Sequence, residues 1–304
     1  MKVLKFGGSS LADAPRYLRV TGICMTTHQT DGAAVVLSAP KGVTNALSSL
    51  CEQAAAGDDF QPLFEKLEQT VQGIADELNT TLDNFAHDHV SSFISERLSA
   101  LKQQLEGIKL LGCAPDSVAA GILSIGEYIS VTLFSAILQS KGVVNSIIDP
   151  VEYVLAHGEY LDSIADVAMS KARFSDVKND GSVLLVMPGF VAVNEEGEKV
   201  TLGRNGSDYS AAILAACIDA DCCEIWTDVD GVYNADPNQV EGAVLLDKLT
   251  YQEAMELSYF GAKVLHPKTI GPIAQHHIPC LIKNPLNPSA PGTLISNEAS
   301  EKWT

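Results

Sequence analysis

The amino-acid sequence predicts an α/β fold in which helices cover a mainly parallel sheet. Short apolar runs of the kind found in buried strands alternate with helical stretches along the first two-thirds of the chain. This alternation is typical of parallel sheets, because the connection between two parallel strands is usually a helix. The chain has 304 residues, of which 46% are hydrophobic, so it can bury a large core and has room for two lobes.

Strands are predicted where short apolar runs end in turn residues. The segment 33–38 is apolar over almost its whole length, as expected of a strand buried on both faces of a sheet. In chain order, the predicted strands are 3–6, 33–38, 143–148, 183–187, 222–227 and 280–283. A turn is predicted at 149–150. The segments 190–193 and 199–202 flank the turn sequence Asn-Glu-Glu-Gly, which predicts a β-hairpin.

The predicted helices lie between these strands. In chain order they are 15–25, a helical region over 45–104, and then 116–140, 162–174, 209–218, 251–260 and 266–275. The region 45–104 is polar and acidic, with breaks near 57–59 and 79–80, so we expect a helical excursion at one edge of the fold. The long apolar helix 116–140 is followed by Gly142, which is typical of a helix end, because glycine readily adopts the left-handed conformation needed there.

The charge of the chain limits its partners. A net charge of −18 at pH 7 and a pI near 4.6 argue against a nucleic-acid partner. The same charge repels anionic substrates, although salt screens it beyond roughly 8–10 Å. Any phosphate- or carboxylate-binding site therefore needs its own local cations. The cations that fall within motifs are Lys5, Arg204 and Lys263.

The cysteines and the hydropathy pattern indicate a reduced, cytoplasmic protein without a membrane span. The seven cysteines are scattered through apolar or helical segments and include no C-x-x-C pair, so we expect mostly buried, reduced thiols. Cys222 and Cys223 would point to opposite faces of a strand, which is poor geometry for one metal ion. The longest apolar runs are broken well before the ~20 residues of a membrane span. The chain also reaches Gly7 too early for a signal-peptide core.

Two glycine-rich turns are the strongest chemical signals. Lys5-Phe6-Gly7-Gly8-Ser9-Ser10 follows a predicted strand, and Thr-Leu-Gly-Arg-Asn-Gly-Ser-Asp at 201–208 opens an apolar helix. The backbone N–H groups of such turns suit an anion because no Cβ blocks its approach, and a neighbouring lysine suits a transferring phosphoryl group. The alternative for Lys5 is a solvated lysine at a strand end. The chain has no G-x-x-x-x-G-K-[ST] and no G-x-G-x-x-G after a strand, which argues against a P-loop enzyme and a dinucleotide-binding protein.

Six segments, taken in order, resemble aspartate kinases of the amino acid kinase family. They are 5–10, 37–39 with 43–45, 124–127, 203–208, 226–233 and 260–267. The segments 224–233 and 251–267 most resemble the kinase domain of bifunctional aspartokinase–homoserine dehydrogenases. The resemblance spans nearly the whole chain and implies a three-layer αβα sandwich of the amino acid kinase, or carbamate kinase-like, type. It implies a single kinase domain over 1–304, with an aspartate-binding lobe over approximately 1–200 and a nucleotide-binding lobe over approximately 201–304.

The resemblance also implies roles for the two glycine turns. Lys5 would hold the transferring phosphoryl group. The residues that would donate hydrogen bonds to phosphate oxygens are Gly7, Gly8 and Ser9. These roles fit phosphoryl transfer, in which positioning and positive charge provide most of the catalysis. Asp208 would pair with Lys5 and orient it, and the alternative is an acidic residue that only caps the start of a helix.

The residues that would bind the amino-acid substrate, by the same resemblance, are Ser38, Thr44, Glu127 and Arg204. Glu127 lies within the predicted helix 116–140, where a glutamate needs a partner, and the matching family residue contacts the α-ammonium group of aspartate. Arg204 could clamp a carboxylate through two hydrogen bonds, with a surface arginine as the alternative. Ser38 and Thr44 match hydroxyls near the substrate and phosphate, and the alternative for both is turn formation.

The residues that resemble the ATP-binding segment of the family are Thr227, Asp228, Tyr233, Lys263 and Val264. Asn238 stands where the family usually has arginine. The loss of this positive charge is expected to weaken phosphate contact or to leave that contact to Lys263, so it affects the affinity for the nucleotide. Magnesium is expected only as the ATP-bound ion, held mainly by phosphates and water. No carboxylate or cysteine ligand set accompanies His266, His276 or His277, so no metal site is predicted there.

By this resemblance the chain is expected to be an aspartate kinase, which converts ATP and L-aspartate to ADP and 4-phospho-L-aspartate for lysine, threonine and methionine biosynthesis. One alternative is a family relative that acts on glutamate, acetylglutamate or a nucleotide. Another is a non-catalytic aspartate- or nucleotide-binding subunit. The pair Glu127 and Arg204 favours a free α-amino acid as substrate, and the pair Lys5 and Asp208 favours catalysis over binding alone.

Regulation is a further expectation from the resemblance. Aspartate kinases usually carry small regulatory ACT domains behind the catalytic unit. Nine residues, 296–304, follow the segment that resembles the end of the kinase domain, which is too few for a domain with its own core. We therefore expect no ACT domain and no feedback inhibition by lysine or threonine. A homodimer, if it forms, is expected to use the surface of the kinase domain.

Overall fold

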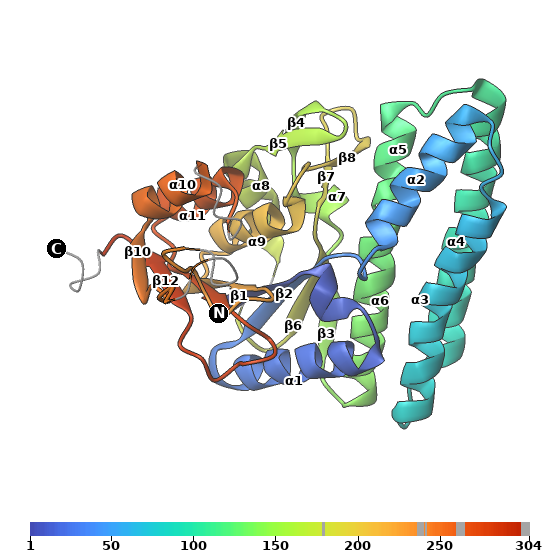
Figure 1. The fold of residues 1–304 in the computed structure, drawn as a ribbon. Coiled ribbons are helices and arrows are strands. Elements are labelled where there is room, and N and C mark those ends of the chain that lie inside the picture. Colours follow the sequence, from blue (N-terminus) through green and yellow to red (C-terminus); the bar gives the residue numbers. More distant parts are fainter. Residues whose placement is uncertain (178–179, 236–239, 241, 260–264, 299–304) are drawn as a thin grey trace.

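The computed structural model describes residues 1–177, 180–235, 240, 242–259 and 265–298. Its centre is an eight-stranded sheet with the strand order β10-β12-β11-β9-β1-β2-β6-β3 (Figure 1). The strands are β1 Lys2–Phe6, β2 Ala33–Leu37, β3 Asn145–Ile147, β6 Leu184–Pro188, β9 Cys222–Trp226, β10 Lys248–Thr250, β11 Cys280–Lys283 and β12 Thr293–Ser296. Neighbouring strands are parallel except β11 and β12, so the predicted mainly parallel sheet is confirmed.

Helices cover both faces of this sheet and complete three layers (Figure 1). Successive side chains of a strand point to opposite faces, so β1 contributes Leu4 and Phe6 to one apolar core and Val3 to the other. The helices on the first face are α1 Ala14–Asp31 and α6 Ile125–Ser140. The helices on the second face are α8 Val167–Arg173, α9 Gly206–Cys217, α10 Tyr251–Tyr259 and α11 Pro267–Gln275.

A helical bundle packs beside α6, at one end of the molecule (Figure 1). Its members are α2 Val43–Ala56, α3 Gln61–Thr81, α4 His87–Leu111 and α5 Asp116–Leu123. This bundle is the helical excursion that the sequence predicts. The breaks predicted near 57–59 and 79–80 are confirmed, because α2 ends at Ala56 and α3 ends at Thr81.

The predicted helix 116–140 is interrupted at Ser124, where α5 ends and α6 begins. The Oγ of Ser124 donates to the carbonyl oxygen of Gly121 at 2.7 Å, and such a bond within a helix often bends it. Among the described residues, Asp116–Ser140 is the one segment long and apolar enough to cross a membrane. However, 83% of its most apolar window is buried inside the fold, as expected of a core helix.

The predicted helix 162–174 is wrong in its first part. Asp162–Ala165 forms strand β5, which pairs antiparallel with β4, Ala156–Glu159, and α8 begins only at Val167. Asp166 separates the two elements because its carboxylate accepts a backbone N–H from the first turn of α8 at 2.8 Å. The prediction placed the start of the helix too early, at Asp162 rather than at Val167, because it did not recognise Asp166 as the N-cap that separates strand β5 from α8.

Other short elements also differ from the prediction. The sequence did not predict β10 or β12, and the predicted strand 143–148 shortens to β3, because strands of three or four residues carry little periodicity. The predicted turn at 149–150 opens a short helix, α7 Pro150–Tyr153, capped by Asp149. The predicted hairpin is confirmed as β7 Val191–Val193 with β8 Lys199–Thr201, and it forms a separate two-stranded sheet.

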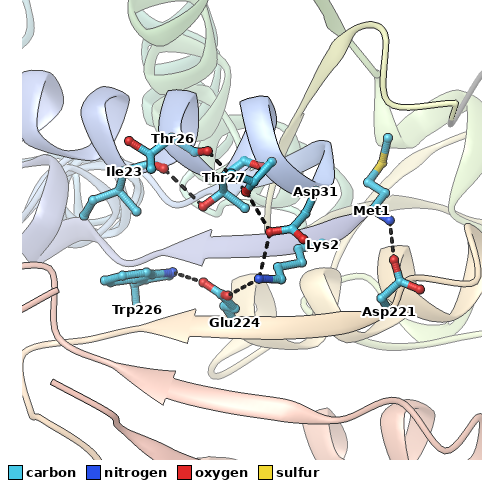
Figure 2. Close-up of polar contacts among 10 residues, drawn as sticks. Met1, Lys2, Ile23, Thr26, Thr27, Asp31, Asp221, Glu224 and Trp226 are labelled. Atoms are coloured by element: carbon cyan, nitrogen blue, oxygen red, sulfur yellow. Dashed lines mark hydrogen bonds and ion pairs between the residues drawn. The ribbon is translucent and has the colours of Figure 1, made fainter. Parts of the chain in front are cut away.

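An ion cluster connects β1 and β9 to the carboxyl end of α1 (Figure 2). Lys2 Nζ lies 3.0 Å from Asp31 Oδ2 and 3.8 Å from Glu224 Oε1. The indole Nε1 of Trp226 donates to Glu224 Oε2 at 3.0 Å. The buried carboxylate of Glu224 therefore has both a charge partner and a hydrogen-bond donor.

We expect the Trp226→Phe variant to be less stable than the wild type by about 1–3 kcal/mol, because the buried carboxylate of Glu224 loses its indole donor. The phenyl ring should keep the stacking on Phe6, whose ring centroid lies 5.6 Å away. Urea unfolding followed by circular dichroism measures the change. The matched control is Trp226→Phe in a Glu224→Gln background, where the cost should shrink because no charge remains. An equal cost in both backgrounds would contradict this account of the cluster.

Candidate active site

The two predicted glycine turns meet at one cavity. The cavity has a volume of about 590 Å³ and lies where β1, β2 and β6 end, the edge at which open α/β sheets bind ligands. Its walls are the turn after β1, the loop after β2, the start of α6, the segment after β6 and the turn before α9. The lining residues that the sequence predicts are Lys5, Gly7, Gly8, Ser9, Ser38, Thr44, Glu127, Arg204 and Asp208.

An ion pair joins the two turns. Lys5 Nζ lies 2.6 Å from Asp208 Oδ1, and both residues are only 9% exposed. Asp208 also belongs to the first turn of α9, where the helix dipole favours a carboxylate. Asp208 therefore both lies at the start of a helix and pairs with Lys5, so the two interpretations of this residue are compatible. The burial of Lys5 excludes the alternative of a solvated lysine.

Glycine brings the first turn close to its neighbours. A Cβ at Gly8 would lie 2.8 Å from the carbonyl oxygen of Ala39, a contact that the backbone could not relieve without shifting. A Cβ at Gly7 would lie 3.3 Å from Lys5 Nζ. Side chains at these positions would therefore crowd the loop after β2 and the ammonium group, and glycine keeps that space open for a ligand.

Glu127 is a buried carboxyl group with an incomplete set of partners. It lines the cavity, is 3% exposed, and lies in the first turn of α6 rather than within one long helix as predicted. Burial raises its pKa to about 8, although the backbone N–H groups of Ala39 and of Glu127 itself favour the charged form. Among the described residues, its Oε2 has no hydrogen-bond partner. A cationic group that entered the cavity would supply one.

Three cationic side chains among the described residues line the cavity of this acidic protein. They are Lys5, Lys41 and Arg204, and the carboxyl groups of Glu127 and Asp208 oppose them. The cavity thus has the local positive charge that an anionic substrate needs in a chain of net charge −18. Arg204 is exposed and forms no ion pair with the described carboxylates, so its guanidinium group is available to a ligand.

Several lining residues had no predicted role. Asn45, Thr201, Asn205 and Ser207 lie within the motifs recognised in the sequence, whereas Lys41 and Phe190 lie outside them. A signal for Lys41 was present, because it is a lysine in a strand-end loop of a strongly acidic chain. Phe190 gave no signal, yet its φ of +72° is uncommon for a residue with a side chain. Its backbone N–H donates to Ser210 Oγ at 2.8 Å, which helps to hold this conformation at the cavity wall.

Of the residues that resemble the ATP-binding segment, the three that the structure describes do not line this cavity. Asp228 lines a smaller cavity of about 190 Å³, and Ser9 and Lys41 line both cavities, so the two are neighbours. Thr227 and Tyr233 line neither of them, although Thr227 Oγ1 donates to Asp228 Oδ1 at 3.2 Å. The predicted residues Lys263 and Val264, and the departure Asn238, lie outside the described residues.

Within the described part of the chain, no group of three or more His, Cys, Asp or Glu side chains could hold a metal ion. His266 caps α11 because its Nδ1 accepts the N–H of Lys268 at 3.2 Å, as a helix-end histidine is expected to do. The seven cysteines are free thiols, and five of them are buried, so the expectation of mostly buried thiols is confirmed. The exceptions are the exposed Cys113 and the half-buried Cys222.

Comparison with known sequences places these features among kinases. The sequence profile described as "Amino acid kinase family" matches residues 1–284. The chain is 48% identical over 304 residues to a bifunctional aspartokinase/homoserine dehydrogenase of Buchnera aphidicola, and 44% identical over 302 residues to one of Haemophilus influenzae. Each match covers 99% of this chain and 37% of the relative, so the chain spans little more than a third of the length of these relatives.

Solved structures of similar fold support the same grouping. The match to E. coli aspartokinase III in complex with aspartate and ADP has a TM-score of 0.88 and 30% identity, and it covers 99% of this chain and 65% of that chain. The uridylate kinase of Archaeoglobus fulgidus matches with a TM-score of 0.53 and 20% identity, covering 97% of this chain and 99% of that chain. This second likeness concerns the fold alone.

Proposed function

This chain belongs to the amino acid kinase family, and from that premise we propose that it is an aspartate kinase. It would transfer the γ-phosphoryl group of ATP to the side-chain carboxylate of L-aspartate, which yields ADP and 4-phospho-L-aspartate. One observation carries the proposal. The buried ion pair of Lys5 and Asp208 shares a single cavity with Glu127, whose Oε2 has no hydrogen-bond partner among the described residues, and with the exposed Arg204. Relatives named aspartokinase support it.

Lys5 is the residue that we propose for transition-state stabilisation. The transferring phosphoryl group spreads negative charge over its peripheral oxygens, and an ammonium group fixed at that point stabilises the charge. Asp208 holds the ammonium group at 2.6 Å and so limits its position. The glycine turn, with Gly7, Gly8 and Ser9, would supply donors to the phosphate oxygens. No general base is needed, because the carboxylate of aspartate is already ionised at neutral pH.

Glu127 and Arg204 would orient the substrate. The α-ammonium group of aspartate would occupy the side of Glu127 Oε2, and the α-carboxylate would bind the guanidinium group of Arg204. Since these two groups share one carbon atom, fixing both also fixes the direction of the side-chain carboxylate. Ser38 and Thr44 line the same cavity and would contact the substrate or the phosphate through their hydroxyls.

ATP is proposed to bind on the β9 side of Lys5. Asp228 lines the smaller cavity, which shares Ser9 with the proposed phosphate-binding turn. The other residues proposed to bind ATP are Thr227, Tyr233, Lys263 and Val264. The nucleotide is thus assigned to residues 201–304, and aspartate mainly to residues 1–200. Magnesium would enter with ATP and be held by phosphates and water, since the described residues offer no ready-made cluster of ligands.

The wider setting is also proposed. The product would serve lysine, threonine and methionine biosynthesis in the cytoplasm, and a homodimer, if present, would use kinase-domain surface. The insensitivity of the 304-residue chain to lysine and threonine stays a prediction. Adding each amino acid at millimolar concentration to the assay described next tests it, and inhibition that is not competitive with aspartate would contradict it.

A coupled assay that follows ADP release tests the proposed function. We expect turnover with L-aspartate and little with L-glutamate, N-acetyl-L-glutamate or uridine monophosphate. N-Acetyl-L-aspartate is the matched control, because it keeps both carboxylates but lacks the ammonium group that Glu127 would bind. Turnover with another acceptor in preference to aspartate, or none with any acceptor, would refute the proposal.

A further inference from the structure

Tyr128 follows Glu127 in the chain but does not line the cavity. It is buried, and its side chain meets three partners. The Nζ of Lys199 lies 4.5 Å from the centroid of its ring, and Cζ of Arg97 lies 5.7 Å from the same centroid. Its hydroxyl donates to Asp149 Oδ1 at 2.6 Å.

The three partners come from three different elements. Lys199 belongs to β8, Arg97 belongs to α4 in the helical bundle, and Asp149 caps α7 by accepting the N–H of Val151 at 3.1 Å. Arg97 also lies over the ring of Phe93, 4.9 Å from its centroid. One side chain at the start of α6 therefore contacts the bundle, the hairpin and α7 at once.

The contact with Lys199 joins the two segments that carry the proposed ligands of aspartate. Glu127 immediately precedes Tyr128 on α6, and Arg204 follows β8 by three residues. The hairpin of β7 and β8 is a separate sheet. Backbone hydrogen bonds from Thr201 to Tyr160 and from Val193 to Val154 hold it to neighbouring segments, and the contact of Lys199 with Tyr128 connects it to α6. Thr201, at the end of β8, lines the cavity, which shows that the placement of this strand also shapes the site.

The environment of Lys199 favours a strong contact. The residue is half-buried, and a cation over an aromatic face gains more when water is excluded. Burial lowers the pKa of Lys199, while the nearby carboxylate of Asp149 acts in the opposite direction and favours the charged form. Asp149 thus supports both ends of the contact, through the hydroxyl of Tyr128 and through the charge of Lys199.

We propose that Tyr128 and Lys199 are positioning residues that fix the separation of Glu127 and Arg204, and thereby set the affinity for the free α-amino acid. The inference rests on the proposed function, since it concerns the substrate side of that site. The α-ammonium and α-carboxylate groups of an amino acid are held at a fixed spacing, so an error in the spacing of their ligands weakens binding directly.

The test compares Michaelis constants of the full chain and its variants. Tyr128→Leu removes the ring, and Lys199→Met removes the charge at similar length. Each variant is expected to raise KM for aspartate roughly tenfold, because the ligands of aspartate are no longer held at the right spacing. KM for ATP should stay within about twofold of wild type, because the binding of ATP is not affected. Tyr128→Phe and Lys199→Arg keep a cation over a ring and should restore most of the affinity.

The matched control is Lys102→Met. Lys102 Nζ lies 5.7 Å from the ring centroid of Phe64, the same kind of contact, but within the helical bundle and away from the cavity lining. Its KM for aspartate should equal that of wild type. The effects of Tyr128→Leu and Lys199→Met should also be non-additive, with little further loss in the double variant.

The possible outcomes separate the inference from the proposed function. If the wild type does not phosphorylate aspartate, the proposed function falls. If the wild type is active, unchanged KM values in both variants, an equal rise for aspartate and ATP, or additive effects would overturn the inference alone. If Tyr128→Leu does not fold, as judged by loss of a cooperative unfolding transition, Lys199→Met against Lys199→Arg decides the question.

Discussion

Replacing Lys5 with Ala is expected to lower kcat for aspartate phosphorylation by roughly 10³-fold, because a fixed cation at the transfer point stabilises charge that appears only in the transition state. KM for aspartate should change far less, since Glu127 and Arg204 remain. The measurement is the coupled assay at saturating ATP and aspartate. The matched control is Lys2→Met, which removes a lysine from the other end of the same strand and should leave kcat within about twofold of wild type.

Stability needs its own control, because the ion pair of Lys5 and Asp208 is buried. Lys5→Ala alone leaves the carboxylate of Asp208 without its ammonium partner, which destabilises a folded protein. The double variant Lys5→Met, Asp208→Asn replaces the pair by neutral groups of similar size and should recover much of the stability while remaining inactive. Activity close to wild type in either folded variant would remove the central catalytic assignment.

Glu127→Gln is expected to raise KM for aspartate roughly 10²-fold and to leave KM for ATP almost unchanged, because a buried charge-assisted hydrogen bond to the α-ammonium group is lost. Arg204→Ala should act in the same direction but less strongly, since its side chain is exposed. Steady-state kinetics with each substrate varied in turn measures both effects. A rise in KM for ATP instead would contradict the proposed division of the site.

Because the pKa of Glu127 is raised, KM for aspartate is expected to depend on pH. Burial raises the pKa to about 8, so the ligand-free side chain is mostly protonated at pH 6 and must lose its proton before it can pair with an ammonium group. KM for aspartate should therefore fall as the pH rises from 6 to 8 and level off above. The profile of Glu127→Gln should be flat over that range, and parallel profiles for the two proteins would contradict the assignment.

The same group affects folding stability with a defined sign. The pKa rises from 4.5 to about 8 on folding, so between these values the folded chain binds more protons than the unfolded chain. The stability contributed by the protonated group is present in full below pH 4.5 and is lost as the pH rises towards 8. Relative to wild type, Glu127→Gln should therefore gain unfolding free energy over this window.

The sequence could predict the two glycine turns because glycines that follow an apolar run and precede a helix are a clear local pattern. The turn after β1 lies at the carboxyl edge of the parallel sheet, as the rule for ligand sites in open α/β sheets predicts. The turn before Asp208 follows β8 of the separate hairpin, so its approach to Lys5 came from the family resemblance and not from this rule. Glu127 stood out for a different reason, as a charge within an apolar segment. The short strands β10, at the sheet edge, and β12, next to it, gave no comparable pattern.

Tyr128 shows what single-sequence reasoning could not supply. Its aromatic side chain in an apolar segment predicts a core residue, and nothing local indicates that Arg97, Asp149 and Lys199 gather around it. These partners come from α4, the cap of α7 and β8, so only the packed fold brings them together. The interruption between α5 and α6 at Ser124 could not be predicted from the local sequence either, because a serine within an apolar helix usually leaves the helix continuous.

The position of β1 has a consequence for the order in which the protein is made. This strand precedes the other strands of the sheet in the chain, yet it lies in the middle of the sheet, between β2 and β9. Its partner β9 begins at Cys222, so at roughly 5–20 residues per second the chain needs on the order of 10–40 s before that side of β1 can pair. Until then the strand that carries Lys5 has one open edge, and neither the ion pair with Asp208 nor the completed cavity can form before the roughly two hundred residues between β1 and α9 have been synthesised. The cavity therefore becomes complete only long after Lys5 itself has been translated.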